Sequence, residues 1–196
     1  MKNKFILLAA LLLVLPVRGC KKEILAPSVI EFDCRSSSTE RKLPNLPNIR
    51  MLADRCEDYV FNIEKLSEAI HIFAQEYSQD FDIDRSVVLS RLTGLRITVS
   101  AIPRTVDAAY DINGKYLKNK VPVNGLAIDK DNIWIEVRTS NISSTALIHE
   151  LVHIMIWRDQ IYHGDPDHEG KEFSGWSKRH TEVIHRVNNI LLDLNI

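Results

Sequence analysis

His149-Glu150-Leu151-Val152-His153 is the stretch that decides how this 196-residue chain is understood. It lies in the apolar run from Ala146 to Trp157, whose length and composition predict a buried helix. Two histidines four positions apart lie on one face of a helix, about one turn from each other, so both imidazoles can reach one tetrahedral zinc ion. Glu150 faces an adjacent part of the same surface, where a carboxylate can accept a proton from water activated by the metal.

A simpler interpretation of the motif is a pair of hydrogen-bonded core histidines. Burial of two histidines and a glutamate on an apolar helix is costly unless they have partners, and this cost favours the zinc interpretation. The polar residues before the helix can cap its start, and the candidates are Asn141, Ser143 and Ser144.

A catalytic zinc usually has three protein ligands, and the motif supplies two. We expect His168 to be the third, because it follows His153 by 15 residues and Gly164 and Pro166 provide a turn between them. The alternative third ligands are His163, Glu169 and Glu172. Asp165 or Asp167 can orient an imidazole as a hydrogen-bond acceptor.

The first 19 residues are typical of a signal peptide. Lys2 and Lys4 precede an apolar stretch from Phe5 to Val17, which is shorter than the ~20 residues that span a bilayer. Gly19-Cys20 at its end resembles a bacterial lipobox, although Arg18 stands where a small residue is usual. We therefore expect lipid at Cys20 and a location at the bacterial cell envelope. The alternative is an ordinary secretory signal and a soluble secreted or periplasmic protein.

Two cysteines remain if Cys20 carries lipid. In an exported protein Cys34 and Cys56 can form a disulfide, and two free thiols are the alternative. Neither cysteine is close in sequence to the motif, so a cysteine ligand for zinc is not indicated.

Composition bounds the remaining choices. Residues 1–19 contain three basic residues and no acidic residue, so their removal lowers the formal charge from -1 to -4. A chain with this charge has no overall basic field, and we expect no nucleic-acid partner. Pro27, Pro44 and Pro47 fall in a segment of low periodicity, which divides the chain into a signal peptide (1–19), a tether (20–48) and a single domain (49–196).

Apolar spacing predicts the elements of that domain. One long or two short helices are expected over 49–77, a short helix over 85–92 that ends before Gly94, and a strand over 95–102. A long polar connection follows over 103–122, then an antiparallel hairpin from Gly125 to Ile128 and from Ile133 to Val137. The motif helix and a C-terminal helix over 169–196 complete the domain.

A small sheet leading directly into a His-Glu-x-x-His helix resembles the zincin metallopeptidases over about Leu95 to Trp176. The resemblance implies an α+β fold, in which a small three-stranded antiparallel sheet packs on the central motif helix between N- and C-terminal helices. In zincins the edge strand beside the motif helix binds extended substrate as an added strand, and Ile133 to Val137 would be that strand.

Residues after the motif narrow the choice of subfamily. Metzincins are excluded, because Ile156 and Asp159 occupy the glycine and third-histidine positions of their pattern. Gluzincins take a glutamate from a later helix, and Glu169, Glu172 and Glu182 are available. The segment from His168 to Phe173 is similar to the His-Gly-x-x-Phe segment of SprT-like proteins, with one residue more.

The activity implied is hydrolysis of peptide bonds by zinc-activated water, with Glu150 as general base. Tyr162, His163 and His180 are candidates for stabilising the oxyanion, although His180 lies on the inner stripe of its helix, where core packing is expected. The predicted partners are a peptide or protein substrate and a membrane, reached through the N-terminal lipid. The alternatives are a lipid-anchored zinc-binding or assembly protein without turnover, and a structural envelope protein.

Overall fold

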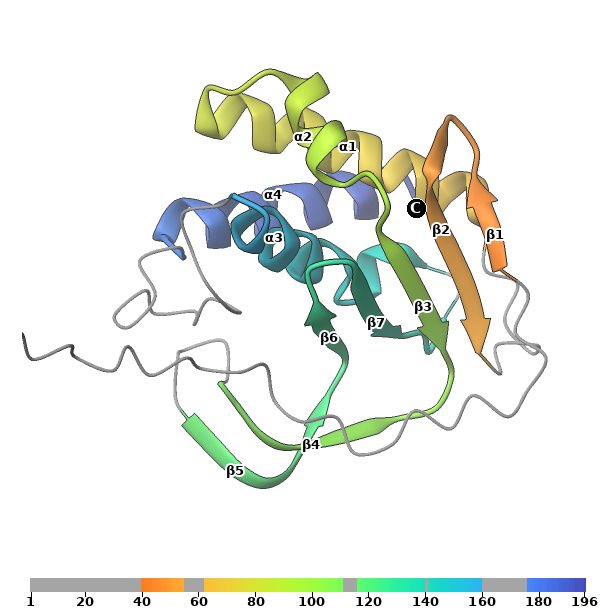
Figure 1. The fold of residues 1–196 in the computed structure, drawn as a ribbon, viewed down its shortest axis with the longest axis vertical. Coiled ribbons are helices and arrows are strands. Elements are labelled where there is room, and N and C mark those ends of the chain that lie inside the picture. The colour runs from red at the N-terminus through yellow and green to blue at the C-terminus, as the bar shows by residue number, and fades with distance from the viewer. Residues whose placement is uncertain (1–39, 55–61, 111–115, 140, 160–175) are drawn as a thin grey trace, which may run out of the picture.

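The computed structural model describes residues 40–54, 62–110, 116–139, 141–159 and 176–196. These residues form two sheets, four α-helices and one 3-10 turn (Figure 1). The strands are β1 (Glu40–Leu43), β2 (Leu46–Asp54), β3 (Arg96–Ser100), β4 (Arg104–Tyr110), β5 (Tyr116–Val123), β6 (Gly125–Asp129) and β7 (Asn132–Glu136). The helical elements are α1 (Ile63–Phe81), α2 (Arg85–Arg91), η1 (Ile142–Ser144), α3 (Leu147–Trp157) and α4 (Lys178–Asp193).

The main sheet is mixed and has five strands in the order β1-β2-β3-β7-β6. β2, β3 and β7 run parallel to one another, whereas β1 and β6 are antiparallel to their neighbours. The prediction of a small three-stranded antiparallel sheet is therefore wrong. The predicted hairpin at its edge is confirmed, because β6 pairs antiparallel with β7.

The parallel pairing depends on the connections between strands. Neighbouring parallel strands need a long crossover, and α1 with α2 supplies it between β2 and β3. β3 and β7 become parallel because the chain leaves the sheet through β4 and β5 and returns along β6 in the opposite direction. Apolar alternation within each strand contains no information on these partners.

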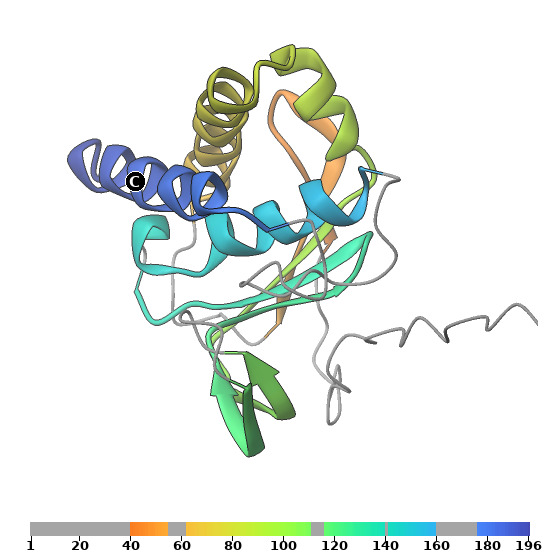
Figure 2. The same ribbon diagram turned by 90° about the vertical axis from the view of Figure 1, so that its left-hand side faces the viewer.

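The helices lie on one side of the main sheet (Figure 2). Ile97, Val99, Ile133 and Ile135 on the central strands are fully buried in one hydrophobic core with the apolar residues of the helices. α3 contributes nearly its whole length to this core, from Leu147 to Ile156. The motif helix is therefore held by apolar burial, as the sequence predicts for a helix that is hydrophobic all round.

The segment predicted as a long polar connection, 103–122, contains a second sheet. β4 and β5 form an antiparallel hairpin that extends from the main sheet on the side away from the helices (Figure 2). Val106 on β4 packs with Leu126 and Trp134 of the main sheet in a small separate core. The expectation of a loop was wrong because polar residues on the outer face of a two-stranded hairpin mask its strand pattern.

Helical spacing also misled the prediction over 49–77 at its N-terminal end. Ile49 and Met51 are buried strand residues of β2, and the tether predicted to end at residue 48 includes β1 and the start of β2. Helix α1 begins at Ile63, where the side chain of Asn62 accepts a hydrogen bond from the backbone N–H of Lys65 at 3.0 Å.

The short second helix and its cap are confirmed. The Asp84 carboxylate accepts a hydrogen bond from the Ser86 backbone N–H at 2.6 Å at the start of α2. Gly94 follows the helix with φ 82°, a left-handed conformation that glycine adopts without strain.

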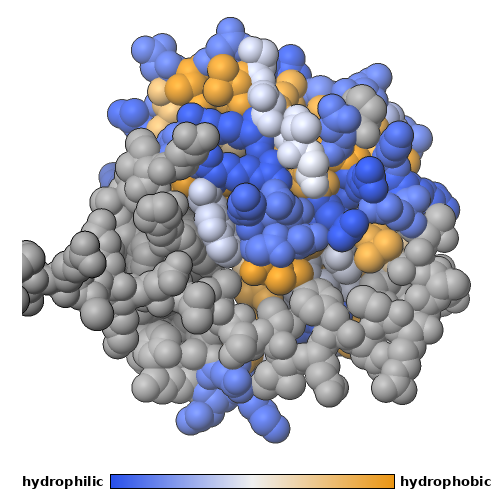
Figure 3. Space-filling view, in the orientation of Figure 1, coloured by the Kyte–Doolittle hydropathy of each residue, from blue (hydrophilic) through white to orange (hydrophobic). Residues whose placement is uncertain are grey.

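On the face seen in Figure 3, hydrophilic residues dominate the described surface and the hydrophobic areas are separate and smaller. Val87, Leu192 and Leu194 are the large hydrophobic side chains that are exposed among the described residues. Among the same residues, no helix combines the length and apolar character needed to cross a membrane.

Candidate metal centre

The two motif histidines come together on one face of α3. Their Nε2 atoms are 3.1 Å apart, and their ring centroids are 4.9 Å apart. Two nitrogen ligands of a tetrahedral zinc are separated by roughly 3.3 Å when each Zn–N bond is 2.0–2.1 Å. The donor atoms of His149 and His153 therefore already have close to the spacing that a shared zinc ion requires.

Glu150 is directed toward β6 and is 4 % exposed. A Cβ atom placed on Gly125, the first residue of β6, would lie 2.5 Å from Oε1 of Glu150 and 2.6 Å from the Cβ atom of Ala146. The glutamate carboxylate thus occupies the space left by the missing side chain of Gly125. A glycine within a strand can indicate such a close approach, and this was the one sequence signal for its role.

The strand beside the motif helix is not the one predicted from the resemblance. Ile133 to Val137 corresponds to β7, which lies between β3 and β6 inside the sheet. β6 is the terminal strand at this side of the sheet, and it carries Gly125 against Glu150. The edge position passes to β6 because β7 is paired on both sides, with β3 in parallel and β6 antiparallel.

We predict that Gly125→Ala lowers both stability and any activity that depends on Glu150. The added methyl group must displace the Glu150 side chain or separate β6 from α3, at a cost of roughly 1–3 kcal/mol. A misplacement of about 1 Å can lower a catalytic rate on the order of 100-fold. Urea unfolding and peptide cleavage, measured on the same preparation, check the two effects.

Gly94→Ala is the matched control for this substitution. A Cβ atom there meets nothing within 4 Å, but the left-handed backbone makes alanine unfavourable by roughly 1–2 kcal/mol. This variant should lose stability and keep its activity per folded molecule. Equal activity in both glycine variants would contradict a role for the contact between Gly125 and Glu150.

The start of the motif helix differs from the prediction. Ala146 is the N-cap residue of α3 and has no capping side chain, whereas the predicted candidates form the 3-10 turn η1 just before it. The Thr145 hydroxyl accepts a hydrogen bond from the Leu147 backbone N–H at 3.3 Å, and the Asn141 side chain caps η1 instead. A local cap was displaced by one turn because η1 packs against α4 through buried Ile142.

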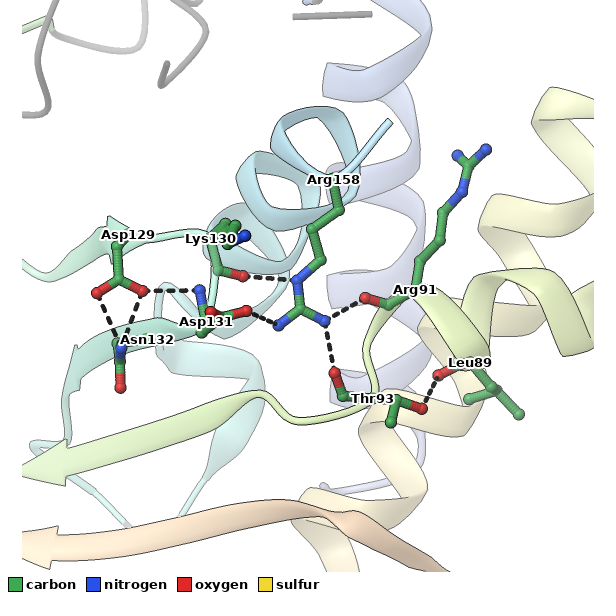
Figure 4. Close-up of polar contacts among 8 residues, drawn as sticks. All are labelled: Leu89, Arg91, Thr93, Asp129, Lys130, Asp131, Asn132 and Arg158. Carbon is green, nitrogen blue, oxygen red and sulfur yellow. Dashed lines mark hydrogen bonds and ion pairs between the residues drawn. The ribbon is translucent and has the colours of Figure 1, made fainter. Parts of the chain in front are cut away.

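The end of the motif helix is anchored by Arg158 (Figure 4). Its guanidinium donates hydrogen bonds to the backbone carbonyl of Lys130 at 2.6 Å, to that of Thr93 at 2.8 Å and to that of Arg91. It also forms an ion pair with Asp131 at 2.8 Å. One side chain therefore joins the end of α3 to the turn between β6 and β7 and to the connection between α2 and β3.

Trp176 packs against both motif imidazoles. Its ring centroid lies 5.3 Å from that of His149 and 5.0 Å from that of His153, and the residue is 7 % exposed. Sequence reasoning placed Trp176 below the expected third ligand and missed its contact with the motif, since the two segments are far apart in the chain.

His180 is buried in an aromatic cluster, as the sequence predicts. Its ring stacks on Phe81 with centroids 4.4 Å apart, and Nε2 lies 3.3 Å from the Tyr77 hydroxyl. Nδ1 accepts a hydrogen bond from the Ser177 backbone N–H at 2.9 Å, so the proton of the neutral ring belongs on Nε2. Burial, assisted by the nearby Arg179 charge, lowers the pKa of His180 to about 4.

This histidine predicts a decrease in stability at acid pH. Its pKa is about 4 in the folded protein and near 6.5 in the unfolded chain, so the unfolded chain binds the proton first as the pH falls. The stabilisation is therefore complete above pH ~6.5 and is lost between pH ~6.5 and ~4, with a slope of at most ~1.4 kcal/mol per pH unit. His180→Gln keeps a capping acceptor without this titration. Urea unfolding across this range should show a smaller slope in the variant, and parallel curves would contradict the assignment.

Several predicted site residues lie outside the described part of the chain. They are Cys20, Cys34, Cys56, Tyr162, His163, His168, Glu169 and Glu172. Among the residues that are described, no group of three or more His, Cys, Asp or Glu side chains is arranged to hold a metal ion. The structure thus brings together two of the three predicted ligands and the predicted general base.

Comparisons with family models, with curated proteins and with solved structures find no match to this chain.

Proposed function

We propose that this protein is a zinc-dependent peptidase in which His149 and His153 bind the metal and Glu150 is the general base. One observation carries the proposal. The Nε2 atoms of the two histidines are 3.1 Å apart on α3, and the buried carboxylate between them in sequence lies against the terminal strand β6. A helix with two core histidines does not need either the convergence of their Nε2 atoms or a glutamate in that position.

The donor set suits zinc, since neutral imidazole nitrogens are among its preferred ligands. Zinc bound there would polarise a peptide carbonyl group and lower the pKa of a water molecule. Glu150 then accepts the proton of the attacking water and transfers it to the leaving amine. Its burial removes competing solvent, which strengthens its interaction with the reacting groups.

The terminal strand β6 supports a peptide as the substrate. A strand at the edge of a sheet can pair with an extended chain through backbone hydrogen bonds. Because Gly125 begins β6 beside Glu150, a peptide paired with this strand would pass close to the general base. Export, lipid at Cys20 and a disulfide between Cys34 and Cys56 remain predictions from the sequence.

Zinc binding by the purified, untagged protein tests the proposal. We expect one zinc ion per chain, and we expect His149→Ala and His153→Ala each to weaken binding at least roughly 100-fold in competition with a chromophoric chelator. His168→Ala should have a similar effect if it is the third ligand. His185→Ala, at an exposed position on α4, is the matched control and should bind like the wild type.

The outcomes separate the parts of the proposal. A wild-type protein that binds no zinc, or motif variants that bind it normally, would overturn the metal site. Normal binding by His168→Ala with loss in a variant of His163, Glu169 or Glu172 would overturn only the assignment of the third ligand.

A further inference from the structure

Trp176 is the aromatic residue that connects the motif helix with α4. Its indole contacts the imidazoles of His149 and His153 together, with angles of 43° and 46° between the ring planes. It is 7 % exposed, so the contact is inside the protein. Both rings that would bind zinc therefore share one rigid neighbour.

The indole is itself held in place. Its Nε1–H donates a hydrogen bond to the Thr181 hydroxyl at 3.1 Å, which determines the orientation of the ring relative to the first turn of α4. That turn is fixed to the end of α1, because the Arg179 guanidinium donates a hydrogen bond to the Asp80 carbonyl at 3.0 Å. Farther along α4, Arg186 forms ion pairs with Glu76 and Asp80, both at 2.7 Å.

An imidazole on a helix has a restricted first side-chain torsion, but its second torsion has a broad range. Without a neighbour, each ring could turn its Nε2 atom away from the point where the two atoms now converge. A flat, fixed surface against both rings limits that rotation. The energetic cost of ordering the ligands is then met when the protein folds and not when the metal binds.

We infer that Trp176 is a positioning residue, oriented by Thr181, that holds the His149 and His153 imidazoles ready for zinc. The inference rests on the proposed zinc site. It assigns to α4 a role beyond packing, since the α1–α4 contacts determine where the indole lies. Groups that orient metal ligands typically change metal affinity 10- to 100-fold when removed.

Zinc affinity and unfolding, measured in the full-length protein, test the inference. Trp176→Ala should weaken zinc binding roughly 10- to 100-fold, whereas Trp176→Phe, which retains an aromatic ring, should restore most of the affinity. Thr181→Val should weaken binding by a smaller factor, and Thr181→Ser, which retains the hydroxyl group, should bind like the wild type. Leu191→Ala removes a fully buried side chain of α4, so it should lower stability and leave zinc affinity unchanged.

Trp176→Ala that binds zinc as tightly as the wild type would overturn the inference and leave the proposed function standing. An equal loss in Leu191→Ala would also overturn it, because the effect would then come from loosening of α4. A wild-type protein without zinc affinity would overturn the proposed function and the inference together. If Trp176→Ala does not fold, the Thr181 pair decides, and equal affinity in its two variants counts against the inference.

Discussion

The Glu150→Gln substitution is expected to lower the rate of peptide hydrolysis by roughly a thousandfold or more while zinc binding and fold are kept. Glutamine has nearly the same shape as glutamate, so it fits the space against Gly125 and Ala146. It has no charge and cannot accept the proton of the attacking water. Because Glu150 is a proposed base and not a ligand, the metal should stay bound.

The measurement is cleavage of any peptide that the wild-type protein cleaves, together with zinc content and the free energy of unfolding. Glu68→Gln, at an exposed position on α1, is the matched control and should retain full activity. Unchanged turnover in Glu150→Gln would exclude the peptidase mechanism. A wild-type protein that binds zinc and cleaves no peptide in a broad library would favour the zinc-binding module without turnover.

The Arg158→Ala substitution is expected to destabilise the protein by about 3 kcal/mol, the largest effect we expect from a residue outside the core. Arg158 has a side chain that is 12 % exposed, and it bonds to three backbone carbonyls and to Asp131. Its removal leaves several acceptors at once without a cationic donor (Figure 4). Arg158→Lys should lose most of this stability too, since an ammonium group does not reproduce the planar set of donors.

Urea unfolding at neutral pH measures the effect. Arg91→Ala is the matched control, because its side chain forms one ion pair with Asp159 in a more exposed position, and such pairs contribute roughly 0–1 kcal/mol. The carbonyl that Arg91 offers to Arg158 belongs to the backbone and is unaffected by the substitution. A loss in Arg158→Ala that is no larger than in Arg91→Ala would show that the network does not anchor α3.

The interior of the protein follows the sequence pattern closely where the pattern is local. The apolar run around the motif predicts a buried helix, and α3 from Leu147 to Trp157 is one. Asp84 predicts the start of a short helix, and Gly94 its end. Each of these features depends on residues within a few positions of one another, so propensity, capping and periodicity are sufficient to predict it.

The pairing of strands could not be predicted in this way. β2 had the apolar spacing of a helix, and the hairpin of β4 and β5 had the polarity of a loop. The partners of β7 are β3, which lies over 30 residues earlier in the chain, and β6, its neighbour in sequence. The choice between a three-stranded antiparallel sheet and a five-stranded mixed one depends on packing against helices formed by distant segments.

The candidate site divides along the same line. By itself, the sequence determined that His149 and His153 share a helix face with Glu150 beside them, because helical geometry places residues i and i+4 together. Only the tertiary structure decided that the edge strand is β6, that Gly125 makes room for Glu150, and that Trp176 lies against both imidazoles. Those three contacts join segments separated by more than 20 residues, and side chains at such separations meet only when the whole core has packed.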